Sequence, residues 1–401
     1  MSLAQVGGRD LTRQAVHLIE TGKVRPTMRS LRVLAQRLEV PVAALLAPGE
    51  GEAPLDETSL VELDRLCRRH EYEKVVVRAQ EILDYSRAPE LVAGAHYYLG
   101  QAMCYLERPE AALEHLAQAR ELFESFDDDQ GRVAETMELE AQALHIAEDP
   151  RALAVAQEAL HRYRTLDGRR PEVESRLLQR VATIVAGLRE FGPARAYYEE
   201  ALEVAGGVRD LARLARIYHG IGICHLHAGD ARVAEEVLVK AHTLYEAEKR
   251  LAGAGHRTDL ARVENDIGLL LMRQGELARA EESFRSALQR FEAGGHERTC
   301  SHVLLSFGEL RQNQGRLDEA IEFVRRAIDL GARYNEVRTV ATGHQLLGEL
   351  QAASGERDLA LESFGCALDI LRRAGFERRY AECLGARDRA LGGVQATGTS
   401  A

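Results

Sequence analysis

The sequence GLLLMRQGELARAEESFRSA occupies residues 268–287 and carries a pattern that the chain repeats. Gly268 is followed by Gly275, Ala280, Phe284 and Ala287 at offsets of 7, 12, 16 and 19 residues. The same spacing recurs, with decreasing completeness, from Gly308, Gly348, Gly222, Gly100, Ala182, Glu140 and Leu63. These eight copies, about 40 residues apart, indicate a repeat architecture.

The residue types at these offsets indicate how each copy folds. Gly or Ala at fixed positions lets two antiparallel helices cross closely, and an aromatic residue or Leu at offset 16 fills the gap to the next pair. The pattern resembles the tetratricopeptide repeat, with helices or loops longer than that consensus of about 34 residues. The resemblance implies an all-α, right-handed superhelix of about eight helix pairs with a concave inner face. We expect this domain to span residues 59–391, with a capping helix over 377–391 and a frayed tail over 392–401.

The composition supports a packed helical protein. Of 401 residues, 45% are hydrophobic, only 9 are Pro and none is Trp. The abundant Ala, Leu, Glu and Arg lose little side-chain entropy in a helix, so we expect almost no strand. The six cysteines form no CxxC pair, which suits a reducing compartment and unpaired, buried thiols. No secretory leader or membrane-length apolar run is evident, so the sequence predicts a cytoplasmic protein.

The net charge of −11 is unevenly distributed along the chain. Residues 1–47 carry seven basic and three acidic side chains, a net charge of +4, which leaves −15 on the remainder. Phosphate contacts require Lys and Arg, whereas an acidic body is repelled by nucleic acid. This contrast is typical of a DNA-binding domain joined to a regulatory domain.

Residues 12–27, TRQAVHLIETGKVRPT, predict one short helix that ends abruptly. Thr12 can cap its first turn, and Gly22 can end it in a conformation that only Gly adopts easily. Val16 and Ile19 lie three residues apart and share one face. The opposite face therefore remains for polar side chains.

That polar face carries Arg13, Gln14 and His17, and in the DNA major groove Arg pairs with guanine and Gln with adenine. The segment resembles the recognition helix of a Cro/lambda-repressor-type (XRE family) helix-turn-helix, which closes with an Ile-Glu-x-Gly-Lys/Arg-x-x-Pro run. Residues 19–26 read IETGKVRP here. The resemblance implies base contacts from Arg13, Gln14 and His17 and phosphate contacts from Thr12, Lys23 and Arg25.

The expected boundaries of the DNA-binding domain are residues 1–47. The family has one more helix ahead of this segment, so we expect either that the first helix is missing or that the true start lies upstream of Met1. Residues 48–58, which include PGEGEAP, predict a linker because Gly and Pro are combined with like charges.

Candidate groove residues follow from the repeat resemblance, because the first helix of each tetratricopeptide pair lines the groove. The positions six residues before successive anchors are Arg176, Arg216, Arg262 and His302. The positions three before are Gln179, His219, Asn265 and Gln345, with Leu305 interrupting the column. Further candidates are Tyr97, Gln101 and Arg273. Guanidinium groups bind carboxylates and amides pair with peptide groups, which predicts an extended peptide as ligand. The alternative is a solvated polar helix face without a ligand.

No pattern of catalytic or cofactor-binding residues stands out. Cys224, His225 and His227 are close in sequence but would point in different directions on a helix, so we expect no metal site. No Gly-rich phosphate loop follows a predicted strand. No Ser-His-Asp, Cys-His or paired-carboxylate arrangement is distinct from the repeats. We therefore expect neither an enzyme nor a bound cofactor.

A helix-turn-helix head on a tetratricopeptide body is similar to the peptide-sensing quorum regulators of the RRNPP group. That resemblance implies a homodimeric transcriptional regulator in which a peptide or protein effector in the groove sets the affinity for operator DNA. The second hypothesis is an adaptor that holds a partner protein in the groove without binding DNA. The two differ in whether residues 12–27 contact DNA.

Overall fold

The structure is a computed structural model of the 401-residue chain. Its contacts divide the chain into two compact units, Met1–Asp56 and Glu57–Ala401. In the second unit the structure describes residues 57–126, 130–205, 210–252 and 257–392. In the first unit it describes only Thr12, Gln14, Val16, His17, Val33, Leu34 and Arg37.

The described part of the second unit consists of helices joined by short turns, without a strand. The helices are α5 (Glu57–Arg68), α6 (Tyr72–Tyr85), α7 (Pro89–Tyr105), α8 (Pro109–Glu124), α9 (Gln130–Ile146), α10 (Ala152–Arg164), α11 (Pro171–Gly187), α12 (Phe191–Val204), α13 (Leu211–Ala228), α14 (Ala231–Ala252), α15 (Arg257–Arg273), α16 (Leu277–Ala293), α17 (Glu297–Asn313), α18 (Leu317–Arg333), α19 (Val337–Ala353), α20 (Arg357–Arg373) and α21 (Glu377–Gly392). The predicted all-α repeat superhelix is confirmed.

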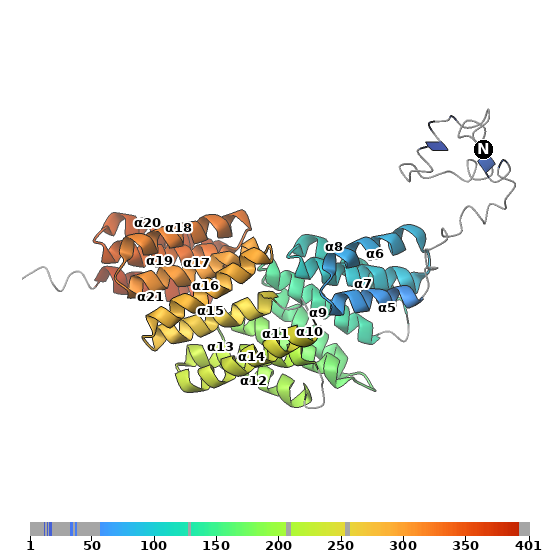
Figure 1. Ribbon diagram of the computed structural model, residues 1–401, viewed down its shortest axis with the longest axis horizontal. Helices are drawn as coiled ribbons and strands as arrows, with labels where there is room; N and C mark the ends of the chain where they lie inside the picture. Colours follow the sequence, from blue (N-terminus) through green and yellow to red (C-terminus); the bar gives the residue numbers. More distant parts are fainter. Residues whose placement is uncertain are drawn as a thin grey trace, which may run out of the picture. The chain divides into compact units, whose positions relative to one another are not determined.

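Each odd-numbered helix packs on the even-numbered helix that follows it, and α21 packs on both α19 and α20. Every odd-numbered helix also touches the next odd-numbered one along the stack, whereas the even-numbered helices have no comparable contacts with each other in the described ranges. We therefore call the odd-numbered helices the inner helices. Figure 1 follows the stack from α5 in blue to α21 in red, with α11–α14 between the two ends.

The repeat offsets correspond to one recurring contact between the two helices of a pair. A Cβ at Gly268 would lie 2.5 Å from Cε1 of Phe284, which is fully buried. The same offset of 16 residues brings Gly308 onto Val324, where an added Cβ would lie 2.6 Å from a methyl group. Phe284 also meets Phe307 of the next pair, with ring centroids 5.7 Å apart. The small residue therefore sets how closely the two helices cross, and the residue at offset 16 joins one pair to the next.

The repeat exceeds the consensus length of about 34 residues because its helices are longer. Each helix from α15 to α20 has 17 residues. Turns of three residues separate them, as between Arg273 and Leu277. Two such helices with their turns account for the spacing of the anchors.

The turn within each pair requires one residue with positive φ. In the last four pairs this residue is Gly, as at Gly275 with φ of 83°. In the first four pairs it is another residue type: His70, Glu107, Glu148 or Arg189. Side chains other than Gly cost about 1–2 kcal/mol in the left-handed region. The turns within the first four pairs are therefore strained by a side chain at positive φ, whereas the turns within the last four pairs have Gly at that position and avoid this strain.

The described positions of the first unit agree with a helix that begins near Thr12. Gln14, Val16 and His17 are helical, and the Val16 N–H donates to the Thr12 carbonyl at 3.0 Å. Val16 is buried, whereas Gln14 and His17 are exposed. The other predicted DNA contacts, Arg13, Lys23 and Arg25, lie outside the described residues. The predicted domain boundaries stay predictions.

Replacing Gly268 with Ala tests the helix crossing. Ala has the higher helix propensity, but its Cβ would force the buried Phe284 ring to shift, so we expect the free energy of unfolding to fall by about 1 kcal/mol or more. Gly365 in α20 is the matched control, since an added Cβ meets nothing within 4 Å there. Gly365→Ala should leave stability unchanged or raise it by up to about 1 kcal/mol. Denaturant unfolding measures both, and shifts in the same direction would contradict this packing role.

Candidate functional site

The first two members of the predicted arginine column are engaged in ion pairs between inner helices. Arg176 on α11 places Nη2 2.7 Å from Glu135 and Nε 3.1 Å from Glu138, both on α9. Arg216 on α13 lies 3.5 Å from Asp259 on α15. These guanidinium groups therefore already have carboxylate partners within the protein.

Arg262 on α15 also lies between carboxylates. Its side chain is 3.5 Å from Asp259 on the same helix and 3.9 Å from Glu107 in the turn between α7 and α8. It remains 48% exposed, whereas Arg216 is 27% exposed. Arg262 is therefore more accessible to a ligand than Arg216.

The fourth member of this column, His302 on α17, is part of a cluster around Glu336. Its Nε2 lies 3.7 Å from Glu336, which also accepts hydrogen bonds from Arg298 at 3.2 Å and from Ser301 at 2.5 Å. Burial would raise the pKa of the Glu336 carboxyl, but these partners outweigh it and lower the pKa to about 2. Glu336 is therefore ionised at neutral pH and joins α17 to the start of α19.

The second predicted column, three residues before the anchors, contains two side chains with internal partners. His219 on α13 lies 2.7 Å from Asp266 on α15. Gln345 on α19 donates to Glu349 one turn later at 3.0 Å. Both are partly accessible on inner helices.

No side-chain hydrogen bond within the described residues holds the other two amides of this column, those of Gln179 and Asn265. Gln179 is half-buried on α11, and its backbone carbonyl accepts from Thr183 at 2.9 Å. Asn265 is half-buried on α15, and its Oδ1 atom is buried without a hydrogen-bond partner among the described residues. A buried acceptor left unpaired costs about 1–3 kcal/mol. Asn265 is thus the predicted groove residue with an unmet hydrogen-bonding requirement.

The remaining groove candidates lie in three different environments. Tyr97 is buried on α7, with the guanidinium of Arg132 5.8 Å from its ring centre. Gln101 is half-buried on the same helix. Arg273 is exposed at the end of α15 and donates to the Leu226 carbonyl. Tyr97 therefore packs in the core, while Arg273 remains accessible.

The structure adds an inner-helix arginine that the repeat offsets missed. Arg180 on α11 lies 2.7 Å from Glu138 and donates to Gln142 at 2.7 Å, both on α9. It follows Arg176 by four residues, so the two share a helix face and the Glu138 carboxylate. That spacing was visible in the sequence, but the partners on α9 were not.

Two strained turns contact inner helices far along the chain. Glu107 accepts a hydrogen bond from the Thr299 hydroxyl on α17 at 3.2 Å. Glu148 accepts from the backbone N–H of Arg338 on α19 at 2.8 Å and from its Nε at 2.7 Å. Only 7% of the Glu148 side chain and 20% of the Arg338 side chain are exposed. The first pairs of the stack therefore bind directly to the last pairs.

A third strained turn makes a similar contact, since Arg189 lies 2.8 Å from Glu382 on α21. The Arg298 guanidinium also donates to the Ile146 carbonyl at 2.9 Å. We call the three turn residues and their main partners the turn clasp. It comprises Glu107, Glu148 and Arg189 with Thr299, Arg338 and Glu382.

His145 lies beside the clasp and is held neutral. Burial lowers its pKa to about 3, and the nearby cations Arg338, Arg180 and Arg262 contribute. Its backbone carbonyl accepts from Arg338 Nη2 at 3.3 Å. The His145 imidazole is therefore neutral at neutral pH and adds no positive charge beside Arg338.

Cys224, His225 and His227 face different neighbours. Cys224 is buried, His225 lies 3.2 Å from Asp230, and His227 stacks on Phe191 with ring centroids 4.0 Å apart. Within the described ranges no group of three or more His, Cys, Asp or Glu side chains is arranged to hold a metal ion. Nor does any described helix have the length and hydrophobicity needed to cross a membrane.

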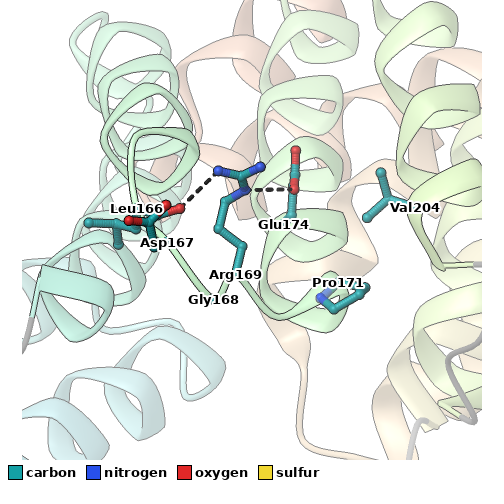
Figure 2. Close-up of a pocket in the computed structure, with 7 residues that line it drawn as sticks. All are labelled: Leu166, Asp167, Gly168, Arg169, Pro171, Glu174 and Val204. Carbon is teal, nitrogen blue, oxygen red and sulfur yellow. Dashed lines mark hydrogen bonds and ion pairs between the residues drawn. The ribbon is translucent and has the colours of Figure 1, made fainter.

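Two surface concavities are lined by none of the predicted groove residues. One, of about 410 Å³, lies at the turn between α10 and α11. Its lining, drawn in Figure 2, is Leu166, Asp167, Gly168, Arg169, Pro171, Glu174 and Val204. Arg169 donates to the carbonyls of Arg164 and Leu166 at 2.8 Å, so it serves to fix the turn. The other, of about 320 Å³, lies between α14, α15 and α16 and includes Val239, His242 and Ser286.

Comparison with known proteins identifies the repeat and the fold. The family model described as tetratricopeptide repeat matches residues 259–330. A Rap protein complexed with competence and sporulation factor is similar in structure, with a TM-score of 0.63 and 15% identity over 90% of this chain and 96% of that one. The apo form of the quorum sensor NprR from B. thuringiensis gives a TM-score of 0.57 at 15% identity, covering 88% of this chain and 95% of that one.

NprR in complex with its cognate peptide NprX gives a TM-score of 0.56 at 12% identity, over 72% of this chain and 82% of that one. Comparison with curated protein sequences returns no significant match. The chain thus contains tetratricopeptide repeats and shares the fold of Rap and NprR proteins. The helix-turn-helix resemblance of residues 12–27 stays a prediction.

A double-mutant cycle on Glu148 and Arg338 tests the turn clasp. Glu148→Gln and Arg338→Gln should each destabilise the chain, with a coupling energy of about 1–3 kcal/mol, because each leaves a largely buried charged partner unpaired. Asp369 and Arg372 in α20 form the control pair, 3.6 Å apart with both side chains over 60% exposed. Their coupling should be close to zero. Denaturant unfolding provides all the values, and equal coupling for the two pairs would rule out a special role for the clasp.

Proposed function

We propose that the repeat unit binds an extended peptide, or an extended segment of a partner protein, along its inner helices. Asn265 carries the proposal, because its buried Oδ1 has no hydrogen-bond donor among the described residues. A peptide N–H supplies such a donor without regard to the side chains of the ligand. The neighbouring Arg262, 48% exposed, can contact the same ligand.

The fold likeness supports a peptide ligand. The Rap protein was solved with competence and sporulation factor, and NprR was solved with its cognate peptide NprX. This chain shares their superhelix, and its inner helices carry charged and amide side chains that suit a peptide backbone with polar side chains. The other predicted groove residues remain candidates for the same contact.

The proposal extends to regulation of DNA binding by a homodimer. Gln14 and His17 are exposed on a helix whose Val16 is buried, which is the orientation that base contacts require. Arg13, Lys23 and Arg25 add positive charge to the same segment. In this proposal the peptide changes the geometry of the repeat unit and thereby the spacing of two DNA-binding segments. An adaptor that binds a partner protein without DNA is the alternative.

Peptide binding is tested by selecting random heptapeptides from an mRNA-display library on the purified full chain. Asn265→Ala should weaken binding of the enriched peptides about 5- to 10-fold, because one hydrogen bond is lost. It should not lower the unfolding free energy, because the Asn265 Oδ1 has no hydrogen-bond partner among the described residues.

Asn313→Ala is the matched control for Asn265→Ala. Asn313 is exposed at the end of α17 and bonds only to the carbonyl of Glu309 in the described part. It should leave peptide affinity unchanged. The absence of any enriched peptide on the wild-type chain would overturn the proposal.

DNA binding is tested by a gel shift of the full chain on the region upstream of its own coding sequence. Gln14→Ala should weaken binding to the preferred site by about 5- to 100-fold, because bidentate base contacts contribute about 1–3 kcal/mol of discrimination. Gln157→Ala, an exposed position on α10, is the matched control. Binding should also weaken as salt rises. Peptide binding without salt-sensitive, sequence-preferring DNA binding would favour the adaptor.

A further inference from the structure

Three arginines from distant parts of the chain, Arg189, Arg273 and Arg379, lie close enough to His227 at the end of α13 to lower its pKa. Arg189 lies in the turn after α11, Arg273 ends α15, and Arg379 is in the first turn of α21. His227 stacks on Phe191, and the guanidinium of Arg189 lies 5.7 Å from the centre of the same ring. We call these three arginines the His227 arginine cluster.

Two members of the cluster have no carboxylate partner among the residues that the structure describes. Arg189 pairs with Glu382 at 2.8 Å. In the described part of the chain, Arg273 donates to the Leu226 carbonyl, and Arg379 donates to the Thr342 hydroxyl at 3.4 Å. No ion pair joins either of these two to a described acidic residue, and the Nε of Arg379 is buried without any hydrogen-bond partner there. In the predicted column, by contrast, Arg176, Arg216 and Arg262 each lie within 4 Å of a carboxylate.

At Arg379 and at His227 the neighbouring arginines have a larger effect on the pKa than the neighbouring carboxylates, which include Asp266 beside His227. The pKa of Arg379 is lowered to about 10, mainly by burial. The cations Arg338 and Arg189 also lower it, whereas Glu148 and Glu382 raise it. Burial also lowers the pKa of His227 to about 4, with Arg189 and Arg273 contributing. An imidazole at this site is therefore neutral at neutral pH, and an added negative charge would be stabilised.

We propose that the His227 arginine cluster is a subsite that binds one carboxylate of the peptide held along the inner helices, with Arg379 as its principal ligand. The unpaired Nε and the fork geometry of the guanidinium suit a carboxylate. This inference rests on the proposed peptide-binding function and names the chemistry of one contact with the ligand.

A single negative charge fits this subsite better than a phosphate dianion. Glu382 pairs with Arg189 and Glu148 with Arg338, so two carboxylates already occupy the edge of the cluster. Arg273 and Arg189 also lie near Glu309 and lower its pKa. Burial and the neighbouring Glu349 outweigh them, so the pKa of the Glu309 carboxyl is raised. Of the two guanidinium groups without a carboxylate partner among the described residues, Arg379 is the one whose buried Nε also lacks a hydrogen bond. A monoanionic carboxylate can pair with it and adds less repulsion against Glu382 and Glu148 than a phosphate dianion would.

The test is the heptapeptide selection repeated on the wild-type chain and on the Arg379→Gln, Arg379→Lys and Arg373→Gln variants. Arg373 is exposed at the end of α20, forms no ion pair with described residues and is the matched control. Peptides enriched on the wild type and on Arg373→Gln should carry Asp or Glu at a fixed position. That preference should be lost on Arg379→Gln and partly kept on Arg379→Lys, which retains the charge.

Synthetic versions of the most enriched peptide then give affinities. Changing its acidic residue to the amide should weaken binding to the wild type about 10- to 100-fold, as expected for a charge-assisted hydrogen bond, and should have little effect on Arg379→Gln. Peptides ending in a free carboxylate or an amide distinguish a terminal from a side-chain carboxylate. Thermal unfolding of each variant verifies that it is folded.

The outcomes separate this inference from the proposed function. Enriched peptides without an acidic preference, or with one that Arg379→Gln leaves intact, would overturn the carboxylate subsite while the peptide-binding function stands. Enrichment of no peptide at all on the wild type would overturn both. A preference lost on Arg379→Gln and kept on Arg373→Gln would support both.

Discussion

The crossing of two helices at a residue without a bulky side chain is the contact on which the stack depends. At Gly268 the helix α15 approaches α16 so closely that the Phe284 ring occupies the place of a Cβ. The same ring reaches Phe307 in the next pair. Because one buried side chain fixes both the distance within a pair and the contact between pairs, its repetition propagates a regular stack. The inner helices, which touch their successors, form one continuous surface from this repetition.

The two halves of the stack use different residue types at the positive-φ position of the turn within each pair. Gly229, Gly275, Gly315 and Gly355 adopt positive φ without a side chain in the last four pairs. Glu107, Glu148 and Arg189 adopt it at a cost of about 1–2 kcal/mol each, and each forms hydrogen bonds or an ion pair with a helix near the other end of the stack. Strain retained at such positions is usual where a side chain has a function. Here the charged residues hold distant pairs of the superhelix together.

Internal pairing divides the polar groups of the inner helices into two classes. Arg176, Arg216 and His219 are bound to carboxylates of neighbouring inner helices, so a ligand would have to compete with those partners. Asn265 and Arg379 retain atoms without a partner in the described part of the chain. A peptide that satisfies them gains hydrogen bonds that the free protein does not form, and such unpaired groups therefore make stronger binding candidates than polar residues in general.

The sequence by itself determined the repeat, because the offsets from Gly268 record a contact between residues close along the chain. The all-α class, the eight pairs and the capping helix α21 follow from that local periodicity. The sequence also predicted Asn265 as a groove residue from its position three residues before the anchor, and it lies on the inner helix α15. It could not show that Glu148 would bind Arg338, since 190 residues separate them and the contact depends on how the whole stack curves. Nor could it single out Arg379, because this residue lies beyond the last full repeat. Its Nε lacks a hydrogen-bond partner among the described residues, and this depends on which side chains the helices packed around α21 bring near it. Local periodicity fixes the pairs, whereas the accumulated rotation from pair to pair decides which charges meet across the superhelix.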